Sequence, residues 1–82
     1  MNKAFEVLLP GDEEGGIVAA ETSGKARYVA FLAARDANYD FLITKLRVRR
    51  APQFDAWAMI EARPRACYTQ EYVRLRMEAS NV

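Results

Sequence analysis

The change of apolar spacing along the first fifty residues constrains the fold most. Residues 3–9 and 17–22 alternate between apolar and other side chains, as a half-buried strand does, and residues 41–50 alternate again. Between them, residues 24–38 carry small apolar side chains at helical spacing: Ala26, Val29, Ala30, Ala33 and Ala37. The order strand, strand, helix, strand predicts an α+β domain.

Turn residues and caps separate these segments. Pro10 and three glycines surround an acidic triplet, which predicts a hairpin loop between the first two strands. Thr22 or Ser23 supplies a hydroxyl to cap the helix that follows. A right-handed crossover then returns the third strand beside the first. We therefore expect a β-β-α-β core with a three-stranded antiparallel sheet of order 2-1-3 and one helix across one face.

The C-terminal segment gives weaker signals. Pro52 fits the first turn of a short helix whose inward side chains would be Phe54, Trp57 and Ala58. Residues 68–80 read as a helix capped by Thr69, although Val73, Leu75 and Met77 also alternate as in a strand. We favour the helix. The interpretation is one domain over residues 1–82, with a core at 3–50 and a C-terminal extension at 52–82.

Composition excludes several kinds of site. The 82 residues include no histidine and one cysteine, Cys67, so neither an intrachain disulfide nor the usual zinc and haem ligand sets can form. Ser-His and Cys-His nucleophile pairs are excluded as well. We expect no enzyme, no cofactor and no metal; a small enzyme working through carboxylates is the remaining alternative. Since no apolar run reaches the ~20 residues of a membrane span, we expect a cytoplasmic protein.

Two motifs fail on inspection. The string ETSGKAR evokes a phosphate-binding loop, but that motif needs a glycine where Ala19 stands and a hydroxyl where Ala26 stands. Asp12, Glu13 and Glu14 lack the ligand spacing of a calcium loop. A capped helix start and a solvated loop account for both stretches.

The third predicted strand carries the candidate site. Residues 45–50 hold four cations in six positions, although the chain's net charge is +1. Alternation puts Lys45, Arg47 and Arg49 on the face opposite the helix, with about 6.8 Å between each and the next. The candidate binding residues on this basic strand face are Lys45, Arg47, Arg49 and Arg50.

Three interpretations of the basic strand face stay open. It is a solvated face, partly neutralised by cross-strand pairs with Glu6 and Glu21; or a protein-binding surface; or a nucleic-acid-binding surface. A sheet that binds RNA adds aromatic rings for base stacking, and Phe41 alone is available on this face.

The C-terminal segment holds a second set of candidates, of the residue types that dominate binding hot spots. They are Tyr68, Tyr72, Arg74 and Arg76. Because a core of this size is marginal, a homodimer that buries this segment is a further expectation.

Residues 17–55 carry a recognisable pattern. "AETSGKA" at 20–26 followed by "RVRRAPQFD" at 47–55 resembles small uncharacterised proteins encoded by bacteriophages and prophages. That family has no established activity, but small phage proteins commonly bind host macromolecules. The resemblance implies a non-enzymatic inhibitor of a host protein assembly, such as an anti-CRISPR protein, that acts by covering a binding surface. The alternative is a nucleic-acid-binding accessory protein that uses the basic strand face.

Overall fold

Two alternating segments form the centre of the sheet. The computed structural model describes residues 1–8, 11, 14–36, 45–60 and 67–80. Strand β1 (Lys3–Leu8) pairs antiparallel with β2 (Gly16–Ala20), with Phe5 opposite Val18. Strand β3 (Arg47–Arg50) pairs antiparallel with the other side of β1. The predicted α+β class and antiparallel sheet are confirmed, as is the adjacency of the three predicted strands.

The sheet has four strands rather than three. Cys67–Tyr68 forms a short strand, β4, antiparallel to β2, so the order is β3-β1-β2-β4. Two residues are too few to show an alternating pattern, and this strand forms only because β2 presents a free edge. Residues 68–80, read either as helix or as strand, thus contain the end of β4 and then helix α3 (Gln70–Ser80).

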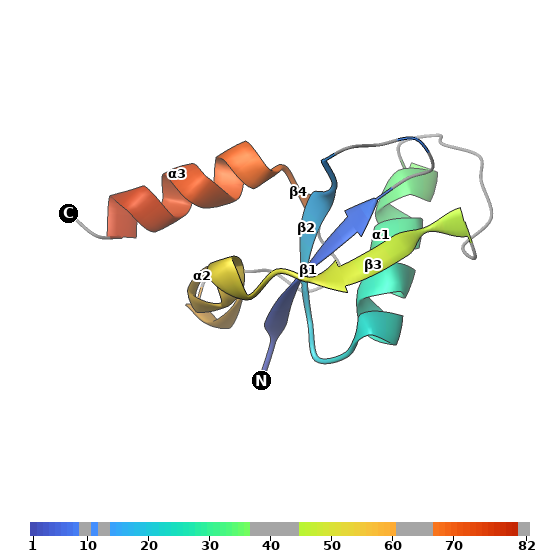
Figure 1. The fold of residues 1–82 in the computed structure, drawn as a ribbon, viewed down its shortest axis with the longest axis horizontal. Helices are drawn as coiled ribbons and strands as arrows, with labels where there is room; N and C mark the ends of the chain where they lie inside the picture. The colour runs from blue at the N-terminus through green and yellow to red at the C-terminus, as the bar shows by residue number, and fades with distance from the viewer. Residues whose placement is uncertain (9–10, 12–13, 37–44, 61–66, 81–82) are drawn as a thin grey trace.

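Helix α1 (Ser23–Asp36) covers one face of the sheet, as predicted (Figure 1). Thr22 is the cap: its Oγ1 accepts a hydrogen bond from the Lys25 N–H at 3.2 Å, and its carbonyl accepts one from Ala26 at 3.0 Å. The small side chains let α1 approach the strands closely. This core comprises Phe5, Val7, Val18, Ala20, Ala26, Val29, Ala30 and Leu46.

The opposite face of the sheet is also covered, and the expectation of an open face was wrong. A 3-10 turn (Pro52–Phe54) leads into α2 (Asp55–Ile60), and α2 and α3 pack on this face (Figure 1). The side chains of this second core are Ala4, Ile17, Ala19, Ala51, Phe54, Trp57, Ala58 and Val73. Ala4, Ile17 and Ala19 are apolar, so leaving them in water would cost free energy that the C-terminal helices recover.

Strand β3 is shorter than the predicted strand at 41–50. Its first pair with β1 joins Arg47 to Leu8, the last residue of β1, so Lys45 lies before the strand. Residues 41–44 of the predicted strand, including Phe41, lie outside the described residues. Of the three cations predicted to share one strand face, Lys45, Arg47 and Arg49, only Arg47 and Arg49 lie within β3.

Candidate partner-binding site

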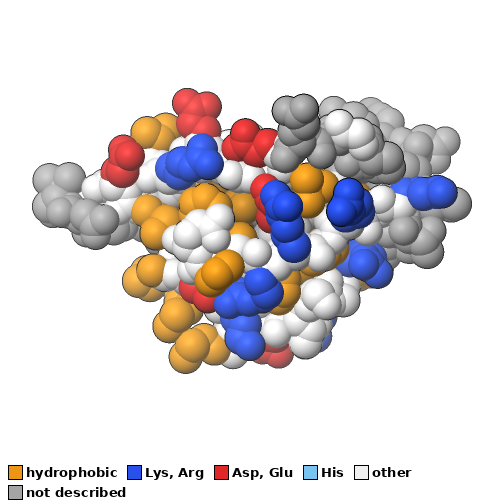
Figure 2. All heavy atoms as spheres, in the orientation of Figure 1, with side chains coloured by type: hydrophobic (Ala, Val, Ile, Leu, Met, Phe, Trp, Pro, Cys, Tyr) orange, Lys and Arg blue, Asp and Glu red, His pale blue; other side chains and the backbone are white. Residues whose placement is uncertain are grey.

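The candidate site lies along β3, at one edge of the sheet. Arg47, Arg49 and Arg50 are exposed and Val48 is half-buried. Lys45, just before the strand, is exposed as well. Figure 2 shows Lys and Arg side chains gathered over the part of the molecule where β3 lies. The fold therefore presents the basic segment to solvent, but at an edge rather than across an open face.

Arg49 is anchored to a buried carboxylate. Its Nε donates a hydrogen bond to Glu6 Oε1, and the two residues are directly opposite each other in the β1–β3 register. The Glu6 side chain is 8% exposed, whereas that of Arg49 is 64% exposed. This cross-strand pair confirms the expected contact between Glu6 and the cations. Because only Nε is engaged in it, the outer end of the guanidinium faces solvent with its remaining donors.

Glu6 is the centre of a polar network that joins four elements. Its Oε2 accepts hydrogen bonds from the Gly15 N–H at 3.2 Å and from Gln70 Nε2. Gln70 Nε2 also donates to the Gly15 carbonyl at 3.0 Å, and Gln70 Oε1 accepts from Arg74 Nη2 at 3.0 Å. The network therefore ties β3, β1, the hairpin loop and α3 together.

The network keeps Glu6 ionised. Burial by itself raises the pKa of a carboxyl group, but the hydrogen bond and charge of Arg49, with the Gly15 N–H and Gln70, outweigh it. The pKa of Glu6 consequently lies below its ordinary value. A charged Glu6 holds Arg49 in place, and the outer end of the guanidinium keeps its N–H donors exposed.

Arg50 is held by the next carboxylate along the chain. Its Nη1 and Nη2 donate to the two Asp55 carboxylate oxygens at 2.9 and 2.6 Å, and Nη1 also donates to the Ala4 carbonyl. The guanidinium lies 5.3 Å from the centre of the Phe5 ring. The Arg50 hydrogen bond holds the pKa of Asp55 below its ordinary value. The two-pronged guanidinium of Arg50 is therefore engaged in an ion pair within the chain.

The four predicted residues thus have three different environments. Arg50 is committed to Asp55, and Arg49 is anchored at one end. Lys45 and Arg47 are exposed and form no ion pair with the residues that the structure describes. The other expected carboxylate, Glu21, pairs with Lys25 at 3.3 Å and not with β3. Lys45 and Arg47 are the cations available to a partner, and the outer end of Arg49 adds N–H donors.

The second predicted set lies around β4 and α3. Trp57, Tyr68 and Tyr72 form a run of rings: Trp57 meets Tyr68 edge-on at 5.0 Å between centroids, and Tyr68 stacks on Tyr72 at 5.2 Å. Trp57 is buried, Tyr68 half-buried and Tyr72 exposed, so the run leads from the second core to the surface. The core role expected for Trp57 is confirmed.

The two arginines of that set lie on α3. Arg74 belongs to the Glu6 network and also approaches Glu14 at 3.8 Å, whereas Arg76 is exposed. The contacts of Arg74 therefore lie within α3 and between α3 and the hairpin loop.

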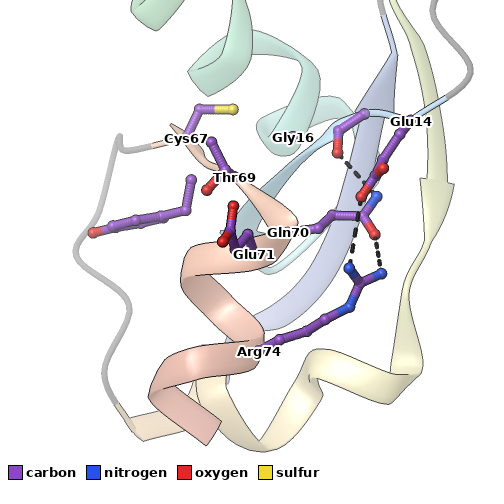
Figure 3. Close-up of a pocket in the computed structure, with 9 residues that line it drawn as sticks. Glu14, Gly16, Cys67, Thr69, Gln70, Glu71 and Arg74 are labelled. Atoms are coloured by element: carbon purple, nitrogen blue, oxygen red, sulfur yellow. Dashed lines mark hydrogen bonds and ion pairs between the residues drawn. The ribbon is translucent and has the colours of Figure 1, made fainter.

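A hollow of about 600 Å³ lies between the hairpin loop and the start of α3. Figure 3 shows its lining, which includes Glu14, Gly16, Cys67, Thr69, Gln70, Glu71 and Arg74. Arg74 is already bound to Gln70 and Glu14, and within the described part of the chain every buried side-chain nitrogen and oxygen has a partner. Burial raises the pKa of the Cys67 thiol, which disfavours the reactive thiolate. These groups give the hollow no evident ligand.

Other kinds of site find no support in the described residues. No three of their Cys, Asp or Glu side chains come together as a metal-binding group. None of the helices in that part of the chain combines the length and apolar character needed to span a membrane. Comparison with known protein families, curated proteins and solved structures finds no match to this chain.

Sequence reasoning missed the Glu6 network. Gln70 lies 64 residues from Glu6 in the chain, and no local pattern links the two. A pair between Glu6 and a cation of the third strand could be predicted from the sequence, because alternation fixes which side chains share a face. That Arg50 would be held by Asp55, five residues away, depended on the turn that begins at Pro52.

Proposed function

We propose that this protein is a non-enzymatic binding protein that docks the β3 edge on an acidic surface of a partner protein and acts by covering that surface. The supporting observation is the accessible edge strand with its cations. Lys45 and Arg47 are exposed, and Arg49 points a fixed guanidinium outward. Anchoring reduces the conformational freedom that Arg49 would lose on binding, which favours association.

A protein partner fits this surface better than a nucleic acid. Among the described residues, the strand face that bears Arg47 and Arg49 has no aromatic ring in β3 on which a base could stack. Arg50, one of the four expected phosphate contacts, already donates two hydrogen bonds to the Asp55 carboxylate. Acidic side chains of a protein can meet the remaining cations individually.

The resemblance to phage-encoded proteins suggests where the partner is found. We propose a bacterial host assembly, with a defence complex such as a CRISPR effector as the leading example. Covering an acidic binding surface on such an assembly would inhibit it without chemistry. The alternative remains a nucleic-acid-binding accessory protein that uses Lys45, Arg47, Arg49 and Arg50 as phosphate contacts.

Capture from a bacterial lysate tests this proposal. The site variant is Lys45→Glu/Arg47→Glu, and the matched control is Arg27→Glu/Arg35→Glu, which makes the same charge change on exposed residues of α1. Arg49 is left intact, because a glutamate there would face the buried Glu6. We expect the wild type and the control to retain a common partner that the site variant loses.

Two outcomes contradict the proposal. Equal capture by all three proteins would show that the β3 edge is not used. Capture that disappears after nuclease treatment, together with nucleic-acid binding that weakens steeply with salt, would support the phosphate-binding alternative instead.

A further inference from the structure

The β3 edge offers backbone groups as well as cations. Strand β3 is the outermost strand of the order β3-β1-β2-β4, and no described strand pairs with it on the side away from β1. We infer that the partner contributes an extended acidic segment that adds to the sheet as a further strand beside β3. This inference rests on the proposed function and specifies how the edge would bind.

The register identifies which backbone groups face outward. Directly opposed residues in an antiparallel pair alternate between hydrogen-bonded and non-hydrogen-bonded positions. The Ala51 N–H donates to the Ala4 carbonyl at 3.0 Å, which places that pair in the hydrogen-bonded class. Counting back along β3, Arg49 and Arg47 belong to the same class. Val48 and Arg50 therefore turn their backbone N–H and C=O groups away from β1, toward the open edge.

Side chains add a preference to this edge. Arg47 and Arg49 lie on one face of the strand, two residues apart, or about 6.8 Å. Val48 lies on the other face, half-buried. An incoming strand with carboxylates at alternate positions would place one against each arginine and an apolar residue beside Val48. Acidic and apolar residues in alternation are the pattern that fits.

A second copy of this chain does not fit the same edge. Antiparallel pairing of β3 with another β3 that puts Val48 opposite Val48 would place Arg47 of each strand opposite Arg49 of the other, and like charges directly opposite each other are destabilising. Charged side chains on an edge strand discourage such pairing in many proteins. The edge therefore rejects its own copy while it attracts a segment of opposite charge.

Amide exchange with a model peptide tests the inference. The probe is a short capped peptide in which Glu alternates with Val, added to isotope-labelled protein at low salt. We expect the Val48 and Arg50 amide protons to become at least tenfold more protected from exchange on binding. The Arg47 and Arg49 amide protons, already bonded within the sheet, should change little. A peptide with Lys in place of Glu should not bind.

Variants separate strand addition from mere charge attraction. Val48→Pro removes one outward N–H without removing a donor to β1, and we expect it to weaken peptide binding about tenfold or more. Because that variant could fail to fold, the same peptide methylated on alternate backbone nitrogens provides an independent arm. Equal binding of the methylated peptide, or binding without protection of Val48 and Arg50, would overturn strand addition. No binding of the acidic peptide would overturn strand addition as well. None of these outcomes changes the lysate result, which tests the proposed function separately.

Discussion

At the scale of single residues, Glu6 has the greatest influence on the candidate site. It is buried, and it accepts hydrogen bonds from Arg49, the Gly15 N–H and Gln70. Removing it would leave the Gly15 N–H and one N–H of the Gln70 amide without an acceptor. The same carboxylate both stabilises the fold and orients Arg49, so the stability of the fold and the proposed docking edge depend on one residue.

We expect Glu6→Ala to reduce the free energy of unfolding by about 1–3 kcal/mol, the range for leaving buried hydrogen-bond donors without an acceptor. Urea denaturation followed by circular dichroism measures this loss. Glu21→Ala is the control, because Glu21 pairs with Lys25 on the surface and its removal should change stability little. Similar stability of the two variants would show that the Glu6 network contributes nothing beyond a surface ion pair.

The pKa of Glu6 gives a pH dependence of definite sign. The folded-state pKa is lowered from 4.5, so ionised Glu6 stabilises the folded state above that pH, and the contribution is lost as the pH falls through the folded pKa. We expect the stability difference between wild type and Glu6→Gln to be largest at neutral pH and to shrink below pH 4.5. A difference that stays constant as the pH falls would contradict this assignment.

At the scale of elements, the return of the hairpin into β2 depends on close backbone contact. A Cβ on Gly15 would lie 2.4 Å from the Val7 carbonyl oxygen and 2.8 Å from its carbon. Neither atom can move without disturbing β1. By contrast, a Cβ on Gly24, near the start of α1, would meet nothing within 4 Å. The two glycines therefore offer a matched pair for testing the hairpin geometry.

We expect Gly15→Ala to lower the melting temperature markedly and Gly24→Ala to stabilise the protein by about 0.5 kcal/mol, because alanine restricts the unfolded chain more than glycine does. Thermal unfolding of both variants provides the comparison. If Gly15→Ala proved as stable as the wild type, the tight approach of the loop to β1 would be wrong.

At the scale of the whole molecule, one sheet separates two small cores, and the second core is closed by short helices that leave apolar side chains in water. The molecule measures 40 × 23 × 20 Å, with α3 extending away from the sheet (Figure 1). Figure 2 shows hydrophobic side chains gathered over α2 and α3. The exposed apolar residues of these helices are Met59, Ile60, Tyr72 and Leu75.

This exposed surface supports the expectation of a homodimer. We propose that two copies associate through α2 and α3, away from the β3 edge, because burying these side chains releases them from water. Sedimentation over a concentration series should show a monomer–dimer equilibrium that Ile60→Glu shifts toward monomer. Tyr28→Glu, on exposed α1, is the control and should leave the equilibrium unchanged. A monomer at every concentration would refute the dimer.

The sequence by itself determined the local elements and the faces of their side chains. Alternation placed Phe5 and Val7 on the face opposite Glu6, and the Thr22 and Thr69 caps define the starts of α1 and α3. These features depend on neighbours within a few residues, which the pattern records directly.

Tertiary structure alone decided which side chains of the basic segment are paired and which are exposed. It added β4 at the free edge of β2 and covered the second face of the sheet with α2 and α3. It also joined Glu6 to Gln70 and Arg50 to Asp55, which left Lys45, Arg47 and the outer end of Arg49 for a partner. The physical reason is that burial and long-range hydrogen bonds depend on which elements meet in space, and periodicity along the chain carries no record of that.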